Sequence, residues 1–258
     1  MRLPAGFLDG KKGLVVGVAN ADSIAAGCAR AFRQGGAELA LTYLNDKARP
    51  HVEPVAREVE APILAPLDVT SPDEMEALFE RIRHSWGRLD FVLHSIAYCP
   101  KDDLHGRVTD CSREGFGAAM DVSVHSLIRL ARHAEPLMPD GGCLLTVSYY
   151  GSERVVDHYN VMGPVKAALE ATARYLAAEL GPGGIRVNTL SPGPLKTRAA
   201  SGIRYFDRLI DRAAAEAPTR RLVTIEEVGA LAACLVSDFA HSVTGNTAYV
   251  DGGHHIMS

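Results

Sequence analysis

The feature of this sequence that most constrains its fold is a regular alternation of short apolar runs with longer amphipathic stretches. The apolar runs are rich in Val, Ile and Leu, have the length of buried strands, and span residues 13–18, 39–43, 63–67, 91–96, 143–148, 186–190 and 247–251. Helical patterns between them span residues 23–34, 72–84, 115–137, 165–179 and 225–236. Since parallel strands need crossover helices, the alternation predicts a doubly wound α/β fold with a seven-stranded parallel sheet and helices on both faces.

The length and charge of the chain narrow its class. Its 258 residues contain no linker rich in Pro, Gly or Ser, so residues 1–258 are expected to form one domain. The 27 basic and 31 acidic residues give a net charge of -4, which argues against a nucleic acid or an anionic membrane as the main partner. No apolar segment suits a signal peptide or a membrane span, and a cytoplasmic protein is expected.

The cysteines and histidines give no sign of a disulfide framework or a metal site. The five cysteines are scattered, odd in number and without a C-x-x-C pair, which is typical of reduced thiols. Ten histidines are present but no H-E-x-x-H motif, so no catalytic metal is expected.

The segment after the first predicted strand has features of a phosphate-binding turn. In a doubly wound fold, ligands bind beyond the carboxyl ends of the strands. Gly17 lets the chain turn closely under a ligand, and Ser23 can cap a helix whose N-terminus offers free N–H groups to a phosphate. A dinucleotide pyrophosphate would fit there. Because G-x-G-x-x-G is absent, an ordinary glycine turn with a serine cap is the alternative.

The ends of the second and third strands are where such a fold holds the adenosine of a dinucleotide. An acidic residue there grips the ribose, whereas an arginine accepts a 2′-phosphate. Leu44 stands at the tip of the second strand in place of either, which favours NADH and leaves NADPH open. After the third strand, Asp68 and Val69 are expected to contact the adenine, or else Asp68 caps the helix that begins near Pro72.

The segments after the fourth and sixth strands are expected to hold the nicotinamide end and the substrate. Small and backbone groups of residues 94–100 reach the centre of the sheet, where Cys99 either lines the substrate site or is a small buried side chain. Residues 191–202, with two prolines and two glycines, suit a loop over a cofactor, and Thr197 is placed to bond a phosphate. The wider segment around 191–217 is expected to cover the substrate.

Tyr159 and Lys166 lie seven residues apart, close to two helical turns, so both side chains can face one cleft. A neighbouring ammonium favours the phenolate form of a tyrosine and lowers its pKa. Pro164 cannot donate a helical N–H and suits a first turn, which indicates that Tyr159 precedes the regular helix. A bound cofactor, more than the helix, would then bring the two groups to one task.

Taken together, these motifs resemble the short-chain dehydrogenase/reductases, and among them the bacterial enoyl-acyl-carrier-protein reductases of fatty-acid synthesis. The similarity runs along essentially the whole chain and includes the stretches GVANADSIAAG, TYLND, DVT, HSIA, SREGF, LLTVSYYG, YNVMGPVKAALEA, GIRVN, GPLKTRAASGI and VDGG. Most short-chain dehydrogenases carry a Tyr-x3-Lys pair. Here Gly163 occupies the position of that lysine, and the x6 spacing from Tyr159 to Lys166 is similar to that of the enoyl reductases.

The resemblance implies a Rossmann-like homotetramer that uses NADH and receives its substrate on acyl carrier protein. It implies catalytic roles for Tyr149, Tyr159 and Lys166, and a place for Cys99 beside the acyl substrate. The positions that it implies around the cofactor are Gly17, Ser23, Ile24, Leu44, Asp68, Val69, Ile96, Lys166, Leu195 and Thr197.

Two positions depart from the commonest pattern of the family. Leu44 stands where many NADH-using members carry Gln, which removes a polar contact and leaves the choice between NADH and NADPH open. Ala97 replaces a frequent Gly and narrows the site by a methyl group.

The reaction implied by the resemblance is reduction of a trans-2-enoyl thioester. Tyr159 would stabilise the enolate by hydrogen bonding, Lys166 would hold the nicotinamide ribose, and Tyr149 would position the substrate or assist the proton relay. Tyr150 is expected to pack at the strand end. One alternative is a ketone or alcohol reductase, which should carry Tyr-x3-Lys. The other is a non-catalytic dinucleotide-binding regulator, which should have lost the tyrosine or the lysine.

Overall fold

Seven parallel strands form one sheet in the computed structural model, which describes residues 6–195, 197 and 206–257. The strands are β1 (Lys12–Val16), β2 (Glu38–Tyr43), β3 (Ile63–Pro66), β4 (Phe91–His94), β5 (Gly142–Val147), β6 (Ile185–Pro192) and β7 (Thr247–Val250). Every neighbouring pair is parallel, and the order across the sheet is β3-β2-β1-β4-β5-β6-β7. The predicted sheet is confirmed.

The direction in which strands are added reverses between β1 and β4. The chain runs outward from β1 through β2 to β3, then returns to the other side of β1 and continues from β4 to β7. Val15 on β1 therefore has Leu41 of β2 on one side and Leu93 of β4 on the other. Connections that leave β1 and β4 diverge at this point, which opens a crevice beyond their carboxyl ends.

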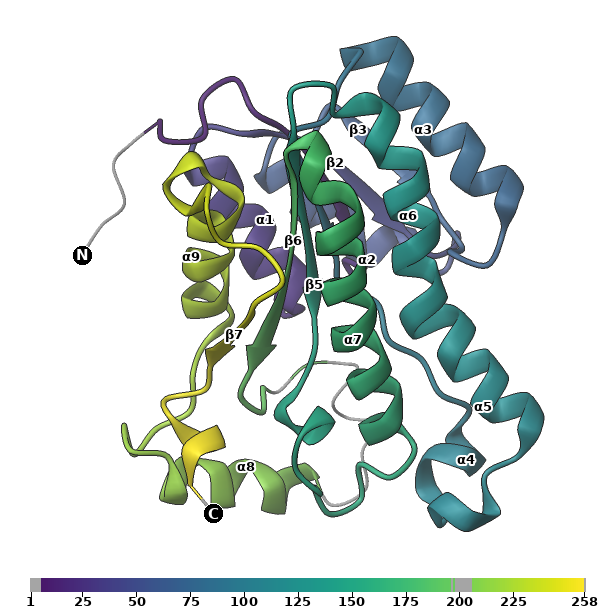
Figure 1. Cartoon of the computed structure of the whole chain (residues 1–258), viewed down its shortest axis with the longest axis vertical. Helices are drawn as coiled ribbons and strands as arrows, with labels where there is room; N and C mark the ends of the chain where they lie inside the picture. Colours follow the sequence, from purple (N-terminus) through teal and green to yellow (C-terminus); the bar gives the residue numbers. More distant parts are fainter. Residues whose placement is uncertain (1–5, 196, 198–205, 258) are drawn as a thin grey trace.

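Helices cover both faces of the sheet (Figure 1). One face packs against α1 (Ile24–Gln34), α2 (Arg49–Glu58) and α9 (Ile225–Val236), and the other against α3 (Pro72–Trp86), α6 (Ser126–Ala134) and α7 (Met162–Leu180). Alternate residues of a strand enter opposite cores, so Leu14 packs on the side of α7 and Val15 on the side of α1. Burial on both faces explains why the strands read as continuous apolar runs.

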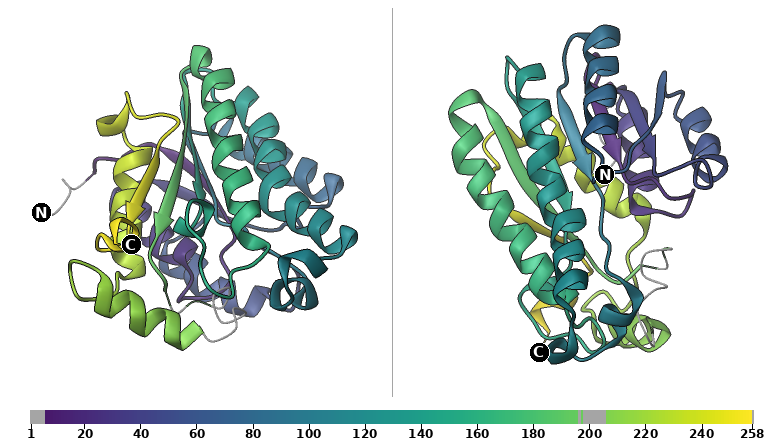
Figure 2. Two further views of the ribbon diagram at one scale, coloured as in Figure 1. Left: turned by 60° about the horizontal axis from the view of Figure 1, so that its bottom comes forward. Right: turned by 90° about the vertical axis from the view of Figure 1, so that its right-hand side faces the viewer.

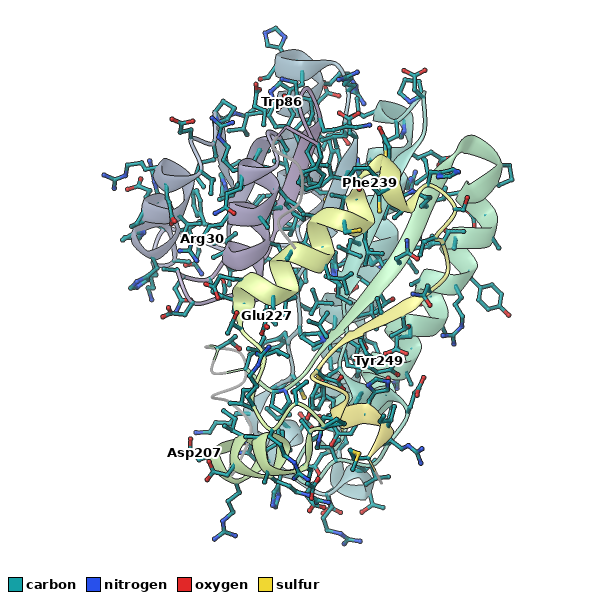
Figure 3. The ribbon with its side chains drawn as sticks, turned by 90° about the vertical axis from the view of Figure 1, so that its left-hand side faces the viewer. Arg30, Trp86, Asp207, Glu227, Phe239 and Tyr249 are labelled. Atoms are coloured by element: carbon teal, nitrogen blue, oxygen red, sulfur yellow. The ribbon has the colours of Figure 1, made fainter. Side chains whose placement is uncertain are left out.

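The backbones of α1 and α9 approach each other closely. A Cβ atom at Gly27 would lie 2.4 Å from the Ile225 carbonyl oxygen, and one at Gly229 would lie 2.4 Å from the Gly27 carbonyl oxygen. Any side chain at either position would force the helices apart. Figure 3 views the molecule from the side of these helices, with Tyr249 of β7 nearby. The contact holds α1 in place at the edge of the crevice.

The expected helix over residues 115–137 is interrupted in the structure. It consists of α5 (Arg113–Met120), the π-helical turn η2 (Asp121–His125) and α6. Ser123 of this turn accepts a hydrogen bond from the Tyr98 N–H and donates one to the Tyr98 carbonyl. The π turn thereby ties the segment after β4 to the helical layer.

Three helices of the structure are absent from the sequence prediction: α2, α4 (Lys101–His105) and α8 (Phe206–Glu216). Pro50 and Pro54 both lie in α2, where they read as breaks in a helical pattern. Pro50 occupies the first turn, which tolerates proline, and tertiary packing of Val52 and Val55 compensates for Pro54. α8 lies within the segment expected to be a covering loop.

Helix α7 begins before residue 165, the expected start, and includes Pro164 in its first turn. Tyr159 precedes the helix, as predicted. The residues on either side of it, His158 and Asn160, have positive φ angles of 64° and 45°. This irregular turn, rather than helical periodicity, sets the direction of the Tyr159 side chain.

The cysteines are free thiols, as predicted. Across residues 6–195, 197 and 206–257, no three His, Cys, Asp or Glu side chains gather in a way that could hold a metal ion. In the same part of the chain, every helix is too short or too polar to cross a membrane.

Candidate active site

A cavity of about 370 Å³ lies at the carboxyl edge of the sheet, which the left view of Figure 2 brings forward. The predicted site residues in its wall are Ile24, Ile96, Cys99, Tyr149, Tyr159, Lys166, Leu195 and Thr197. The other wall residues are Ser95, Ala97, Tyr98, Leu104, Val147, Ser148, Met162, Pro192, Gly193 and Leu209. The cavity therefore joins α1, α7 and α8 to the ends of β4, β5 and β6.

Two tyrosines meet in this cavity. The ring centroids of Tyr149 and Tyr159 lie 5.0 Å apart at an interplanar angle of 65°, an edge-to-face contact. Tyr150 packs edge-on against Tyr149 at 4.8 Å, which agrees with the packing role expected for it. The buried hydroxyl of Tyr149 has no hydrogen bond of normal geometry to any residue that the structure describes. The Tyr150 hydroxyl lies close enough to help raise the pKa of Tyr149, so the Tyr149 hydroxyl can turn to Tyr150 or to a molecule in the cavity.

The phenol of Tyr159 is held in its protonated form. Burial raises the pKa of Tyr159, and the negative charge of Glu170 raises that pKa further. The expectation that Lys166 lowers the pKa of Tyr159 is therefore wrong, because desolvation dominates and Lys166 is not among the groups that shift it. A protonated phenol donates a hydrogen bond, which suits a partner oxygen that gains negative charge.

Lys166 reaches from α7 to the end of β5. It is 5% exposed, and its Nζ donates a hydrogen bond to the Val147 carbonyl oxygen at 2.7 Å. Burial lowers the pKa of Lys166 to about 8, and the charge of Glu170 partly offsets this effect. An ammonium has three N–H donors. Two of them therefore remain for hydroxyl groups in the cavity.

The turn after β1 has the shape expected of a phosphate cradle. Gly17 has a φ of 103°, and a Cβ atom there would lie 2.1 Å from the Ser95 carbonyl oxygen. Ser23 caps α1, as predicted, by accepting a hydrogen bond from the Ala26 N–H at 3.3 Å. Ile24, the first residue of α1, lines the cavity. The free N–H groups of α1 thus lie beside the cavity wall.

Leu44, Asp68 and Val69 lie at the ends of β2 and β3, away from the cavity wall. Leu44 is 56% exposed, and Val69 is buried. Asp68 accepts hydrogen bonds from the Thr70 N–H and hydroxyl at 2.9 and 2.7 Å. Ser71 is the cap of α3, so the alternative in which Asp68 caps this helix is wrong. The adenosine contacts of all three residues stay predictions.

Cys99 lies in the cavity wall as a protonated thiol, because burial raises the pKa of Cys99 to about 11 and Asp103 adds to the effect. A protonated thiol is a poor nucleophile, which favours a lining role. Leu195 and Thr197 enter the wall from the segment after β6. The rest of the predicted covering segment comprises residues 196 and 198–205, which lie outside the described residues, and the region of α8.

Glu170 lies beneath the cavity wall and is absent from the sequence prediction. It lies on α7 one turn after Lys166, is 4% exposed, and accepts a hydrogen bond from the Ser148 hydroxyl. The sequence signal for it is an acidic residue on the apolar face of a helix, four positions after the lysine. Met162 and Leu209 of the wall were also missed. Leu209 has no sequence signal of its own, because α8 reads as loop.

His94 at the end of β4 forms a second buried polar group close to Lys166. Its Nδ1 and Nε2 lie 2.8 Å from Thr146 Oγ1 and Ser126 Oγ, respectively. The Ser126 hydroxyl donates to the Val122 carbonyl, so it must accept from the Nε2–H of His94. Burial, and next the charge of Lys166, lowers the pKa of His94 to about 3. The imidazole is neutral and carries its proton on Nε2.

Residues 17–255 match the family described as enoyl-(acyl carrier protein) reductase. An enoyl-[acyl-carrier-protein] reductase [NADH] of Rhizobium meliloti is 48% identical over 257 residues, which cover 100% of this chain and 94% of that protein. An enoyl-[acyl-carrier-protein] reductase [NADH] of Aquifex aeolicus is 46% identical over 98% of this chain and 94% of that protein.

Solved structures extend the similarity to the whole fold. The enoyl-(acyl-carrier-protein) reductase of Anaplasma phagocytophilum in complex with NAD superposes with a TM-score of 0.95 at 43% identity, over 99% of this chain and 97% of that one. The Bacillus cereus enoyl-acyl carrier protein reductase with NADP+ and an indole naphthyridinone also gives a TM-score of 0.95. It is 44% identical, over 98% of this chain and 99% of that one. Matched over its length in both sequence and fold, the chain belongs to the enoyl-(acyl carrier protein) reductase family.

Proposed function

We propose that this protein reduces a trans-2-enoyl thioester carried on acyl carrier protein, using hydride from a nicotinamide dinucleotide, as a step of fatty-acid biosynthesis. The observation that carries the proposal is the meeting of Tyr149, Tyr159 and Lys166 in one cavity beside the N-terminus of α1. The family to which the chain belongs is named for this reaction.

The residues present fit a dinucleotide. The missing side chain at Gly17 lets the turn after β1 pack against the Ser95 carbonyl, and the N-terminus of α1 offers N–H groups to a pyrophosphate. Two N–H donors of Lys166 suit the hydroxyls of a ribose. NADH is the proposed cofactor, because the Rhizobium meliloti and Aquifex aeolicus relatives are named for it and Leu44 offers no cation to a 2′-phosphate. NADPH is the competing cofactor, since the Bacillus cereus structure holds NADP+.

The side chains of the cavity have separate tasks in this reaction. When bound at this site, a reduced nicotinamide dinucleotide would supply a hydride for the carbon β to the thioester carbonyl. Charge then develops on the thioester oxygen, and the protonated phenol of Tyr159 donates a hydrogen bond to that oxygen. Lys166 holds the ribose hydroxyls and places a positive charge near the developing anion, where burial strengthens its effect. Protonation at the α carbon completes the reduction.

Tyr149 and the apolar wall would orient the acyl group. The hydroxyl of Tyr149 can position the thioester carbonyl or pass a proton to the α carbon. Leu104, Met162 and Leu209 give the cavity an apolar side that suits a hydrocarbon chain. Cys99 lies in this wall, which supports its proposed place beside the acyl group.

The proposed assembly is a homotetramer in the cytoplasm. Large apolar side chains are exposed on three neighbouring helices, namely Phe116 on α5, Ile128 on α6 and Tyr175 on α7, of which Tyr175 is 80% exposed. The right view of Figure 2 looks onto this side of the molecule, with α6 and α7 adjacent. Such a surface suits a second copy of the chain. Light scattering of the purified protein tests this assembly, and a monomer at working concentration would contradict it.

The reaction is tested by mixing purified protein with a crotonyl or longer enoyl thioester and either NADH or NADPH, and following the loss of cofactor absorbance. We expect oxidation of the cofactor, faster with NADH. A β-ketoacyl thioester serves as the matched control, and faster oxidation with it would favour a ketone reductase. No oxidation with any enoyl thioester would overturn the proposal.

A further inference from the structure

The carboxylate of Glu170 lies in the interior beneath the cavity, and nothing in the proposed reaction scheme uses it. Glu170 is 4% exposed and accepts a hydrogen bond from Ser148, the residue that follows β5 and lines the cavity. It also lies one helical turn after Lys166 on α7. A buried carboxylate is costly unless it is paired and hydrogen-bonded, so this placement needs an explanation.

Glu153 and Asp251 act with Glu170 on the pKa of Tyr249, but Glu170 is the one charge among the described residues that acts on the pKa of Lys166. His94 of β4 is neutral, since burial lowers the pKa of its imidazole to about 3. Tyr159 before α7 and Tyr249 of β7 (Figure 3) stay protonated, because burial raises the pKa of each phenol. Glu170 is therefore the counter-charge of the Lys166 ammonium.

The backbone leaves Lys166 dependent on that charge. The Val147 carbonyl accepts one N–H of the ammonium at 2.7 Å, but a carbonyl carries no net charge to balance the ion. Val147 and Ser148 are consecutive, so the lysine and the glutamate are bonded to neighbouring residues at the end of β5. The strand end thus holds the ammonium and the carboxylate in fixed positions, one helical turn apart on α7.

We propose that Glu170 is a positioning residue for the dinucleotide site, where its charge keeps the Lys166 ammonium protonated and its hydrogen bond to Ser148 fixes the strand end that aims the ammonium at the cofactor. The inference rests on the proposed function only in taking Lys166 as the group that holds the dinucleotide. It goes beyond that function by assigning the pH range of cofactor binding to a residue that touches neither cofactor nor substrate.

The test is a fluorescence titration of reduced dinucleotide binding, without enoyl substrate, between about pH 6 and about pH 10. Glu170→Gln removes the charge and keeps the shape and hydrogen-bonding capacity of the side chain. At the acid end of the range, we expect the affinity of Glu170→Gln to be within about twofold of wild type. Its alkaline loss of affinity should begin about one pH unit below that of wild type. Between those two pH values, the variant should bind about tenfold more weakly than wild type. The matched control, Glu179→Gln, removes an exposed charge from the same helix and should leave the profile unchanged.

Two further variants separate charge from hydrogen bonding and from folding. Ser148→Ala keeps the carboxylate, so it should weaken binding about equally at every pH without moving the alkaline loss. Glu170→Asp keeps the charge and should restore the wild-type pH range. An unmoved alkaline loss in Glu170→Gln, or unfolding of both Glu170 variants, would assign the residue a merely structural role and overturn the proposal.

The two proposals fail in different ways. If wild-type protein binds the dinucleotide but reduces no enoyl thioester, the reaction is wrong and the role of Glu170 stands. If wild-type protein reduces enoyl thioesters while Glu170→Gln keeps its pH profile, only the role of Glu170 is wrong. Failure of wild-type protein to bind either dinucleotide would overturn both.

Discussion

At the carboxyl edge of the sheet, the turn after β1 offers a ligand backbone groups, whereas the segment after β5 and the start of α7 offer buried ionisable side chains. Gly17 acts by lacking a side chain, and Ser23 acts by holding the first turn of α1. On the other side, Tyr149, Tyr159 and Lys166 lie in a low-dielectric pocket. The turn after β1, which we call the β1 half of the site, binds a ligand through its shape and its peptide dipoles. The segment after β5 with the start of α7, the β5 half, binds it through side chains whose protonation can change.

This difference predicts that mutations in the two halves will fail in different ways. Changes in the β1 half should weaken cofactor binding at every pH, because backbone N–H groups do not titrate. Changes in the β5 half should alter turnover or the pH dependence of binding, because burial has shifted the pKa of Tyr159 and of Lys166.

The largest effect is expected from Tyr159→Phe. Loss of the hydroxyl removes the donor to the thioester oxygen, so turnover should fall by about 10²–10⁴-fold, while dinucleotide affinity stays within about twofold of wild type. Steady-state rates and a fluorescence titration measure the two quantities. Tyr175→Phe is the matched control, since it lies outside the cavity and keeps the ring on the surface proposed to bind a second copy, and it should leave both quantities unchanged. Retained turnover in Tyr159→Phe would contradict the expectation that the β5 half controls turnover.

Gly17→Ala should give the next largest effect. The new Cβ atom would sit 2.1 Å from the Ser95 carbonyl oxygen at a φ of 103°, so we expect a loss of about 2–4 kcal/mol in the free energy of unfolding and binding weakened at least about thirtyfold. Urea unfolding and dinucleotide titration check this. Gly181→Ala has open space around its Cβ and helical dihedrals, so it should be neutral. Wild-type affinity in Gly17→Ala would show that the turn after β1 does not bind the pyrophosphate of the dinucleotide.

The pH dependence of binding should follow Lys166. The pKa of this lysine is lowered from 10.5 to about 8, so the ammonium is present below that pH and is lost as the pH rises through it. Dinucleotide affinity should then fall by up to about tenfold per pH unit above pH 8. Lys166→Ala should bind weakly at every pH without this loss. A flat wild-type profile through the alkaline range would show that the ammonium does not hold the cofactor.

The smallest effect is expected from the helix caps. Ser23→Ala and Ser71→Ala should each lower the free energy of unfolding by about 1 kcal/mol, since each removes one N-cap hydrogen bond. Only Ser23→Ala should also weaken dinucleotide binding, by about two- to fivefold, because α1 and not α3 begins at the cavity. Equal binding by the two variants would mean that the N-terminus of α1 does not contact the cofactor.

The sheet could be predicted from the sequence because the pattern that specifies each strand lies within that strand. Each strand is an apolar run whose length and composition suffice, and Gly17 and Ser23 follow the first run directly. α2 could not be predicted, because its two prolines read as breaks, although Pro50 suits a first turn and packing of Val52 and Val55 compensates for Pro54. The interruption at η2 follows from a contact between Ser123 and Tyr98 that no local pattern records.

The residues of the candidate site also divide into those that a local sequence pattern predicts and those that only the fold shows. The Tyr159 and Lys166 pair is visible as a spacing, but the protonated state of Tyr159 depends on desolvation by segments distant in the sequence. Glu170 was missed because an acidic residue on a helix is ordinarily solvated, and only the fold reveals that this one is buried against β5. Leu209 could be placed in the cavity wall only once α8 was known to be a helix.

The hydrogen bond from Lys166 to the carbonyl of Val147 has a consequence for how the sequence can change over generations. A backbone oxygen is supplied by every amino acid, so position 147 can exchange one apolar residue for another of similar volume without loss of the acceptor. Position 166 has no such freedom, since only a long cationic side chain spans the distance from α7. One end of the contact can therefore drift among apolar residues of similar volume, while the lysine at the other end stays constant.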